Sequence, residues 1–222
     1  MYFVLFISIA LLSWAVSALL DHRFKKYTKV YLPLTGREVA EKMLRDNGIY
    51  DVQVTCTPGH LTDHYDPRNK TVNLSEAVYS SNNVAAAAVA AHECGHAVQH
   101  AFSYGPLNIR SALVPVVNFA SQWVTWILLG GILMIEVFPQ LLSVGVALYA
   151  LTTLFAFITL PVEMNASARA IAWMEQAGIT DRATTPMASA ALRSAAYTYV
   201  VAALSSLGTL VYYIMILVGR RD

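Results

Sequence analysis

Charged residues are scarce in this chain. They make up 13% of its 222 residues, against about 25% in a typical soluble domain, while 56% of the residues are hydrophobic. The polar groups are too few to cover the surface of an ordinary soluble enzyme, so that class is excluded. The high content of apolar residues also excludes a disordered chain. A net charge of only +1 provides no basic surface for nucleic acid. The two cysteines, Cys56 and Cys94, are too few for a disulfide framework and suit a reducing compartment.

The few charges are also unevenly distributed along the chain. Four stretches contain no Asp, Glu, Lys or Arg: residues 1–20, 111–135, 137–162 and 194–219. Each stretch reaches or exceeds the about 20 apolar residues that cross the hydrocarbon core of a bilayer as a helix. We therefore predict an α-helical multi-pass membrane protein with four spans, near residues 2–20, 113–135, 141–160 and 200–218.

The first stretch has a second interpretation, a cleaved signal peptide. The small residues Ala15-Val16-Ser17-Ala18 loosely resemble a cleavage site. No basic segment precedes the apolar run, however, and the run is longer than usual for a signal peptide. We favour a retained anchor.

The spans divide the chain into five parts. We expect an anchor at 1–20, a polar α+β domain at 21–110, a transmembrane hairpin at 111–160, a helical segment at 161–198 and a last span at 199–222. Because the hairpin crosses twice, both polar parts lie on one side of the membrane. That side carries thirteen of the fifteen Lys and Arg residues, whereas Arg220 and Arg221 lie on the other. The positive-inside rule then predicts a cell-membrane protein with its polar domain in the cytoplasm and both termini outside.

The polar domain contains signals for short helices and strands. Thr35 and Glu38 have the spacing of a capping box, which predicts a helix start. Alternation of apolar and polar residues predicts strands at 51–56 and 70–75, with a third strand within 61–67. An alanine-rich helix is expected from about residue 83 to 101, and it runs almost directly into the second span.

That last helix carries His92-Glu93-Cys94-Gly95-His96, the pattern HExxH. Residues four apart on a helix differ by about 40° and about 6 Å, so both imidazoles can reach one zinc ion. Glu93 is turned about 100° from His92 and can reach a water beside the metal, as a general base must. We predict a Zn²⁺ hydrolase site with His92 and His96 as ligands and Glu93 as catalytic base. Cys94 should face away from the zinc, into the domain.

A catalytic zinc usually has a third protein ligand. The position of the third His in metzincins is Phe102 here, which excludes that class. His100 is turned about 80° from His92 on the same helix and cannot easily reach the same ion. His64 is possible, but the better candidates are Glu163 and Glu175, which lie on the correct side of the membrane. We favour Glu163, because a Glu directly after an apolar span is costly unless it faces protein, a cavity or a cation.

An oxyanion donor is also needed for acyl transfer. The candidates are His64, Tyr65, Tyr197 and Tyr199. We favour Tyr199, because the helix after Glu163 should pass the site.

These motifs resemble those of the YugP-type neutral zinc metallopeptidases of bacterial membranes, which are more distantly similar to HtpX-like and prenyl-protein membrane proteases. The resemblance covers nearly the whole chain and includes residues 35–38, 61–67, 90–96 and 160–163, together with the first and last spans. It implies a zincin-like domain between spans one and two and a gluzincin site.

The resemblance also implies specific roles at that site. His92, His96 and Glu163 would be the ligands and Glu93 the base. Related gluzincins often have an Asp four residues after the ligand Glu, hydrogen-bonded to a ligand His. That position is Ser167 here, so the outer contacts must be arranged differently, and Asn165 is a candidate.

The leading hypothesis is therefore a membrane-bound zinc metalloendopeptidase. Its partners would be the lipid bilayer and a polypeptide substrate held as an added strand along a sheet edge, in a membrane protein or close to the membrane. The alternative is a catalytically inactive, zinc-binding membrane scaffold, although such a protein has no need for Glu93. A transporter is disfavoured, because the four spans contain no ionisable Asp, Glu, Lys, Arg or His. The sequence does not indicate an oligomeric state.

Overall fold

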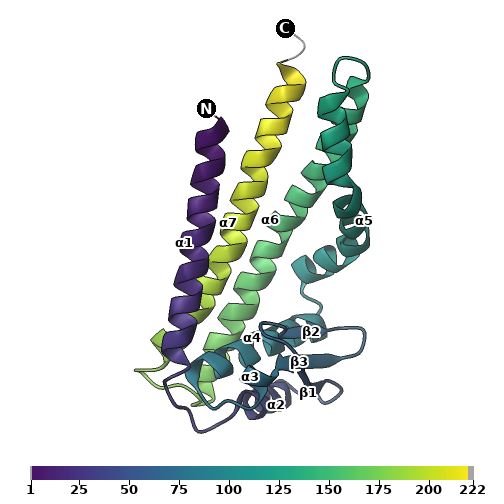
Figure 1. Cartoon of the computed structure of the whole chain (residues 1–222). Coiled ribbons are helices and arrows are strands. Elements are labelled where there is room, and N and C mark those ends of the chain that lie inside the picture. The colour runs from purple at the N-terminus through teal and green to yellow at the C-terminus, as the bar shows by residue number, and fades with distance from the viewer. Residues whose placement is uncertain (1, 220–222) are drawn as a thin grey trace.

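The computed structural model describes residues 2–219, so that Arg220 and Arg221, which enter the topology argument, lie outside the described residues. Figure 1 shows the arrangement of its elements. In chain order they are α1 (Tyr2–Tyr27), α2 (Gly36–Asp46), β1 (Gln53–Thr57), β2 (His64–Asp66), β3 (Thr71–Ser75), α3 (Glu76–Tyr79), α4 (Val84–Ala101), α5 (Gly105–Leu133), α6 (Pro139–Gln176) and α7 (Thr185–Val218).

Four of these helices, α1, α5, α6 and α7, are long and apolar enough to cross a membrane. Their number and places match the four expected spans. The helices are longer than the apolar runs, however: α1 continues through the charged residues to Tyr27, and α6 continues unbroken past Pro161 to Gln176. Figure 1 shows the four helices rising from one end of the molecule, with the start of α1 and the end of α7 both far from the sheet.

The polar domain packs at the lower end of these helices in Figure 1. The expected capping box is present, since the Glu38 carboxylate accepts from the Thr35 backbone N–H at 2.8 Å and the Glu38 N–H donates back to Thr35 Oγ1. The sheet has the order β1-β3-β2, with β1 parallel and β2 antiparallel to β3. The strand expected within 61–67 is β2, which is only three residues long. It pairs with β3 alone and therefore lies at an edge of the sheet.

Helix α4 is the centre of the domain. Its N-cap is Asn83, whose side-chain oxygen accepts from the Ala86 N–H at 2.9 Å. Most of the helix is buried, and its alanines form one hydrophobic core with residues of α2, β3, α6 and α7. Small side chains give α4 a narrow surface on which other helices can pack closely.

The closest of these approaches is made at Gly95. A Cβ atom at this position would lie 2.6 Å from the backbone oxygen of Ala166 on α6, so any larger residue would push the two helices apart. Ala166 is fully buried and lies one turn after Glu163. The glycine inside the HExxH motif therefore brings the helix that carries Glu163 directly against the helix that carries both histidines.

Helix α5 changes direction along its length, as Figure 1 shows. Pro115 lies within it and lacks the N–H that a straight helix would use, which is a common cause of a bend. Further along, Gly131 packs against the Leu142 backbone of α6, where a Cβ would come within 2.6 Å of Leu142 Cα. The last part of α5 thus pairs with α6, while its first turns remain beside the polar domain.

Candidate metal centre

His92 and His96 lie one turn apart on α4 and direct their Nε2 atoms at the same carboxylate. Glu163 Oε2 is 3.3 Å from His92 Nε2 and 3.6 Å from His96 Nε2. The three ligand atoms all lie within 4.8 Å of one another. The structure thus brings together the two motif histidines and the Glu favoured as third ligand, which is 67 positions after His96 in the sequence.

This geometry fits a zinc ion. Zinc bonds of about 2.0–2.1 Å in a tetrahedral arrangement place ligand atoms about 3.3–3.4 Å apart, close to the two distances measured. Glu163 is only 4% exposed, and its Oε2 has no hydrogen-bond partner although it is buried. A buried carboxylate oxygen is expected to bind a cation or a donor, so the donor set is that of a metal centre.

The electrostatics of the histidines depend on the same carboxylate. Burial lowers the pKa of His96, but the nearby carboxylates of Glu163 and Glu93 outweigh it, so that the pKa of His96 is raised above its ordinary value. A metal requires the neutral imidazole, and zinc binding here would therefore release protons.

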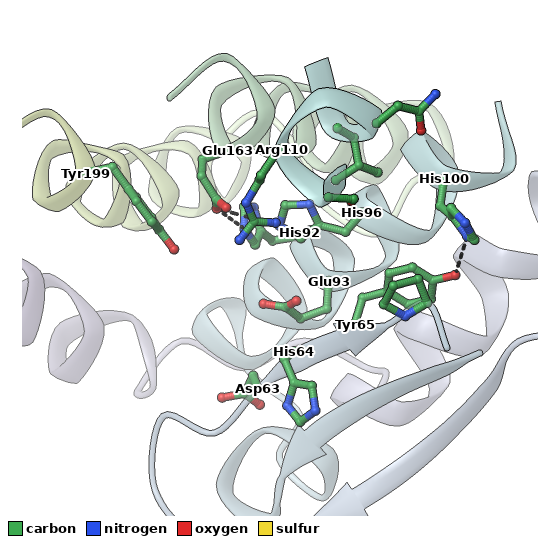
Figure 2. A pocket seen from close by; sticks show the side chains of 14 residues that line it. Asp63, His64, Tyr65, His92, Glu93, His96, His100, Arg110, Glu163 and Tyr199 are labelled. Atoms are coloured by element: carbon green, nitrogen blue, oxygen red, sulfur yellow. Dashed lines mark hydrogen bonds and ion pairs between the residues drawn. The ribbon is translucent and has the colours of Figure 1, made fainter. Parts of the chain in front are cut away.

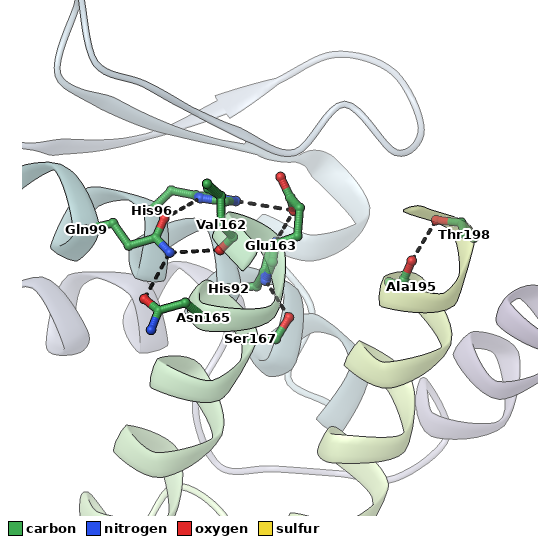
Figure 3. A network of polar contacts seen from close by, with 9 residues as sticks. All are labelled: His92, His96, Gln99, Val162, Glu163, Asn165, Ser167, Ala195 and Thr198. Atoms are coloured by element: carbon green, nitrogen blue, oxygen red, sulfur yellow. Dashed lines mark hydrogen bonds and ion pairs between the residues drawn. The ribbon is translucent and has the colours of Figure 1, made fainter. Parts of the chain in front are cut away.

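Each histidine is oriented by a second contact at Nδ1, shown in Figure 3. His92 Nδ1 lies 3.1 Å from Ser167 Oγ, and His96 Nδ1 lies 3.1 Å from Gln99 Oε1. In the tautomer that donates from Nδ1, both Nε2 atoms carry a lone pair for the metal. The expected role of Asn165 needs correction: it contacts neither histidine, because Ser167 takes the place of the usual Asp.

Gln99 is in turn fixed by α6. It is fully buried, and its amide donates to the Val162 carbonyl at 2.8 Å and to Asn165 Oδ1 at 3.0 Å. Sequence reasoning missed this residue, although its position three after His96 on a helix is the spacing at which side chains meet. Asn165 therefore acts on His96 only through Gln99.

We expect the outer contacts to contribute to metal affinity. Gln99→Ala should lower zinc affinity about 10- to 100-fold, because loss of a partner that orients a ligand histidine has this effect in other metal sites. Ser167→Ala should act in the same direction through His92. Competition with a fluorescent zinc chelator measures the affinity, and Gln53→Ala on the exposed face of β1 is the control. Unchanged affinity in both site variants would show that the two contacts do not orient the ligands.

Glu93 lies between two hollows beside the three ligands. It lines a cleft of about 390 Å³ together with residues of β2, α5 and α7, and a smaller hollow of about 200 Å³ between α4, α6 and α7. Figure 2 shows its carboxylate in the middle of the larger cleft, apart from the cluster around Glu163. Tyr199, the favoured oxyanion donor, lines both hollows.

The other candidates are not part of the metal cluster. His64 lines the cleft, but its two ring nitrogens contact Thr62 O and Asn73 Nδ2. Tyr65 and His100 also line it and bind each other at 2.9 Å. Two further candidates lie outside the cleft, since Glu175 lines a separate groove between α6 and α7 and Tyr197 is absent from the lining.

Cys94 faces the interior of the domain, as the helical geometry predicts. It is completely buried, and its Sγ lies 3.5 Å from the Ala40 carbonyl of α2. Burial raises the pKa of this thiol well above its ordinary value. A protonated thiol directed away from the histidines packs as a small hydrophobic group.

Comparison with known proteins agrees with this donor set. Residues 2–218 match the model of a family described as "Putative neutral zinc metallopeptidase". The chain belongs to this neutral zinc metallopeptidase family. A curated member of similar sequence, "Putative membrane protease YugP" of Bacillus subtilis (strain 168), is 44% identical over 201 residues, which cover 90% of this chain and 88% of the relative. No solved structure matches the chain.

Membership in this zinc metallopeptidase family covers almost the whole described chain, from α1 to α7. The matched region thus includes the polar domain, the hairpin and the last helix. The family name agrees with the donor set of two histidines and one glutamate, and the name of the Bacillus relative agrees with the four apolar helices.

Proposed function

We propose that this protein is a membrane-bound zinc metalloendopeptidase of the gluzincin type, in which His92, His96 and Glu163 hold the metal and Glu93 is the general base. The observation that carries the proposal is the convergence of two Nε2 atoms on one buried carboxylate oxygen, 3.3 Å and 3.6 Å away, beside a cleft. A zinc ion at this place supplies a Lewis acid that acidifies water and polarises a carbonyl oxygen.

The residues around this position can carry out peptide hydrolysis. Glu93 takes a proton from water as the water oxygen adds to the peptide carbonyl carbon, and the carbonyl electron pair moves onto its oxygen. When the C–N bond breaks, Glu93 returns the proton to the leaving nitrogen. Tyr199 of α7, which lines the cleft, would donate a hydrogen bond to the oxyanion that forms between these steps.

The cleft offers a place for an extended polypeptide. Its walls are the edge strand β2, contributing His64 and Tyr65, and the first turns of α5, contributing Leu107 and Asn108, while α4 forms its floor. A substrate backbone can add to the free edge of β2 as a further strand.

We further propose that α1, α5, α6 and α7 span the cell membrane, with the polar domain in the cytoplasm. The end of the third span, near residue 160, is then less than one turn of helix from Glu163. The active site would lie at the membrane surface, where membrane proteins and membrane-proximal polypeptides are within its reach.

The proposal predicts metal-dependent cleavage. Purified protein in detergent should contain about one zinc per chain and cleave casein, an unfolded protein. Treatment with 1,10-phenanthroline should reduce cleavage to background, and added Zn²⁺, but not Mg²⁺, should restore it, because imidazole ligands prefer zinc and Mg²⁺ prefers oxygen ligands. A His92→Ala/His96→Ala protein purified in parallel controls for contaminating proteases. Bound zinc without cleavage of any peptide would instead support the scaffold alternative.

A further inference from the structure

Arg110 is a charged residue of the cleft, and the metal binding and proton transfers described above give it no role. It lies on α5, in the second turn after Gly105, and lines the larger cleft with Glu93, Glu163 and Tyr199. It belongs to the turns that precede Pro115, where α5 remains beside the polar domain. Figure 2 shows its side chain entering the cleft that contains the Glu93 carboxylate.

The Arg110 side chain lacks a partner within the described residues. Its Nε is buried without a hydrogen bond, and it takes part in none of the ion pairs between residues 2 and 219. The other shielded arginines of this part of the chain are bonded: Arg23 donates to the Ala190 carbonyl and Arg169 to Asn165. A guanidinium cannot lose its proton, and a buried N–H donor such as this Nε normally has an acceptor.

The charges of the cleft indicate what kind of partner is missing. Three carboxylates line the cleft, those of Glu93, Glu163 and Asp63. Glu93 and Glu163 would face the two positive charges of zinc, and Asp63 already accepts from the Ser75 N–H and hydroxyl. None of the three forms an ion pair with Arg110, so its guanidinium can meet an anionic group of a bound substrate. Arg110 of α5 lines this cleft together with Tyr199 of α7. Two hydrogen-bond donors, on α5 and α7, therefore face the same space near the metal ligands.

Resting on the proposed peptidase activity, we infer that Arg110 is a catalytic residue whose guanidinium donates to the oxyanion formed when water adds to the peptide carbonyl. The negative charge on that oxygen exists only after the carbon becomes tetrahedral, so the interaction is stronger in the transition state than with the planar substrate. A planar guanidinium with several N–H donors suits a small anionic oxygen group. Arg110 and Tyr199 would both donate to this oxygen, one from α5 and the other from α7.

The inference predicts a specific change in rate. Arg110→Gln should lower kcat about 10²- to 10³-fold, the effect of removing one oxyanion donor, while KM changes less than about 3-fold and zinc content is unchanged. Arg110→Lys should retain more activity than Arg110→Gln, because it keeps a positive charge. Arg110→Ala should regain part of its activity when guanidinium ion is added. Arg182→Gln, in the exposed turn between α6 and α7, is the matched control.

Two inhibitors with the same peptide part separate this role from a structural one. A phosphinic peptide presents a tetrahedral, anionic centre, whereas a hydroxamate binds zinc with a planar group. In Arg110→Gln the Ki of the phosphinic peptide should rise about 100-fold and that of the hydroxamate by less than about 3-fold. An equal change for both inhibitors, or no change for either, would overturn the assignment of Arg110.

The same experiment distinguishes failure of this inference from failure of the proposed function. If the wild-type protein holds zinc and binds both inhibitors, the peptidase site stands, and the Arg110 variant alone decides the inference. If the wild-type protein binds neither zinc nor the hydroxamate, the proposed function fails first and the inference fails with it.

Discussion

Glu93→Gln should keep its zinc and lose at least about 10²- to 10⁴-fold in kcat on a peptide that the wild-type protein cleaves. This is the range that a positioned general base contributes. Glutamine has the shape of glutamate but cannot take a proton from water and return it to the leaving nitrogen. Glu93 lies outside the cluster of His92, His96 and Glu163, so the metal should remain. Zinc content by mass spectrometry and the initial rate on the same sample measure both effects.

A matched substitution controls for the loss of one carboxylate. Glu175→Gln removes the same charge on an exposed part of α6 and should leave the rate within about 2-fold of wild type. Retained activity in Glu93→Gln would refute the mechanism. Loss of zinc in the same variant would show that Glu93 is a metal ligand rather than a base.

Glu163→Ala should abolish stoichiometric zinc binding. It removes one of the three protein ligands, so the loss of affinity should exceed the about 10- to 100-fold expected for an outer contact such as that of Gln99. The fold should survive, because alanine favours helix and the variant no longer buries a carboxylate. Zinc content after gel filtration, with circular dichroism of the same sample, tests both statements.

Glu175 again provides the comparison, since it was the other acidic candidate and lies on the same helix. Glu175→Ala should bind zinc as the wild-type protein does. Undiminished zinc in Glu163→Ala would remove Glu163 from the ligand set. If Glu175→Ala lost zinc while its fold stayed intact, Glu175 would be needed for zinc binding, and its assignment as a residue outside the metal cluster would be wrong.

Local sequence signals were sufficient to predict much of the fold. The charge-free stretches predicted four long apolar helices, and residues 2–219 contain four. The capping box at Thr35 and the strands within the polar domain also form as predicted. The ends of the long helices were less predictable. A helix such as α1 can continue into polar residues, because its backbone hydrogen bonds form within the helix whether the side chains are apolar or charged. Neither did alternation reveal that β3 lies between β1 and β2, since strand order depends on tertiary packing.

The site was predictable where spacing along one helix determines it. Four residues separate His92 and His96, and α-helical geometry places them on one face. Glu163 was a candidate because it directly follows a charge-free run. The contact of Ser167 with His92 depends on how α6 is rotated against α4, which no local pattern specifies. Arg110 belongs to no motif, and its place in the cleft depends on how the first turns of α5 lie against the polar domain, which no local pattern specifies.

The contact at Gly95 has a consequence for how the protein is made. The ligands are split between α4 and α6, and the α5–α6 hairpin separates them in the sequence. In a chain whose spans cross the bilayer, Glu163 reaches the histidines only after both arms of that hairpin have been inserted. A ribosome-bound intermediate, or a fragment that ends before α5, has two histidines and no complete centre. If the chain acts as proposed, insertion itself would thus be the activation step, and a chain that fails to insert would lack its metal.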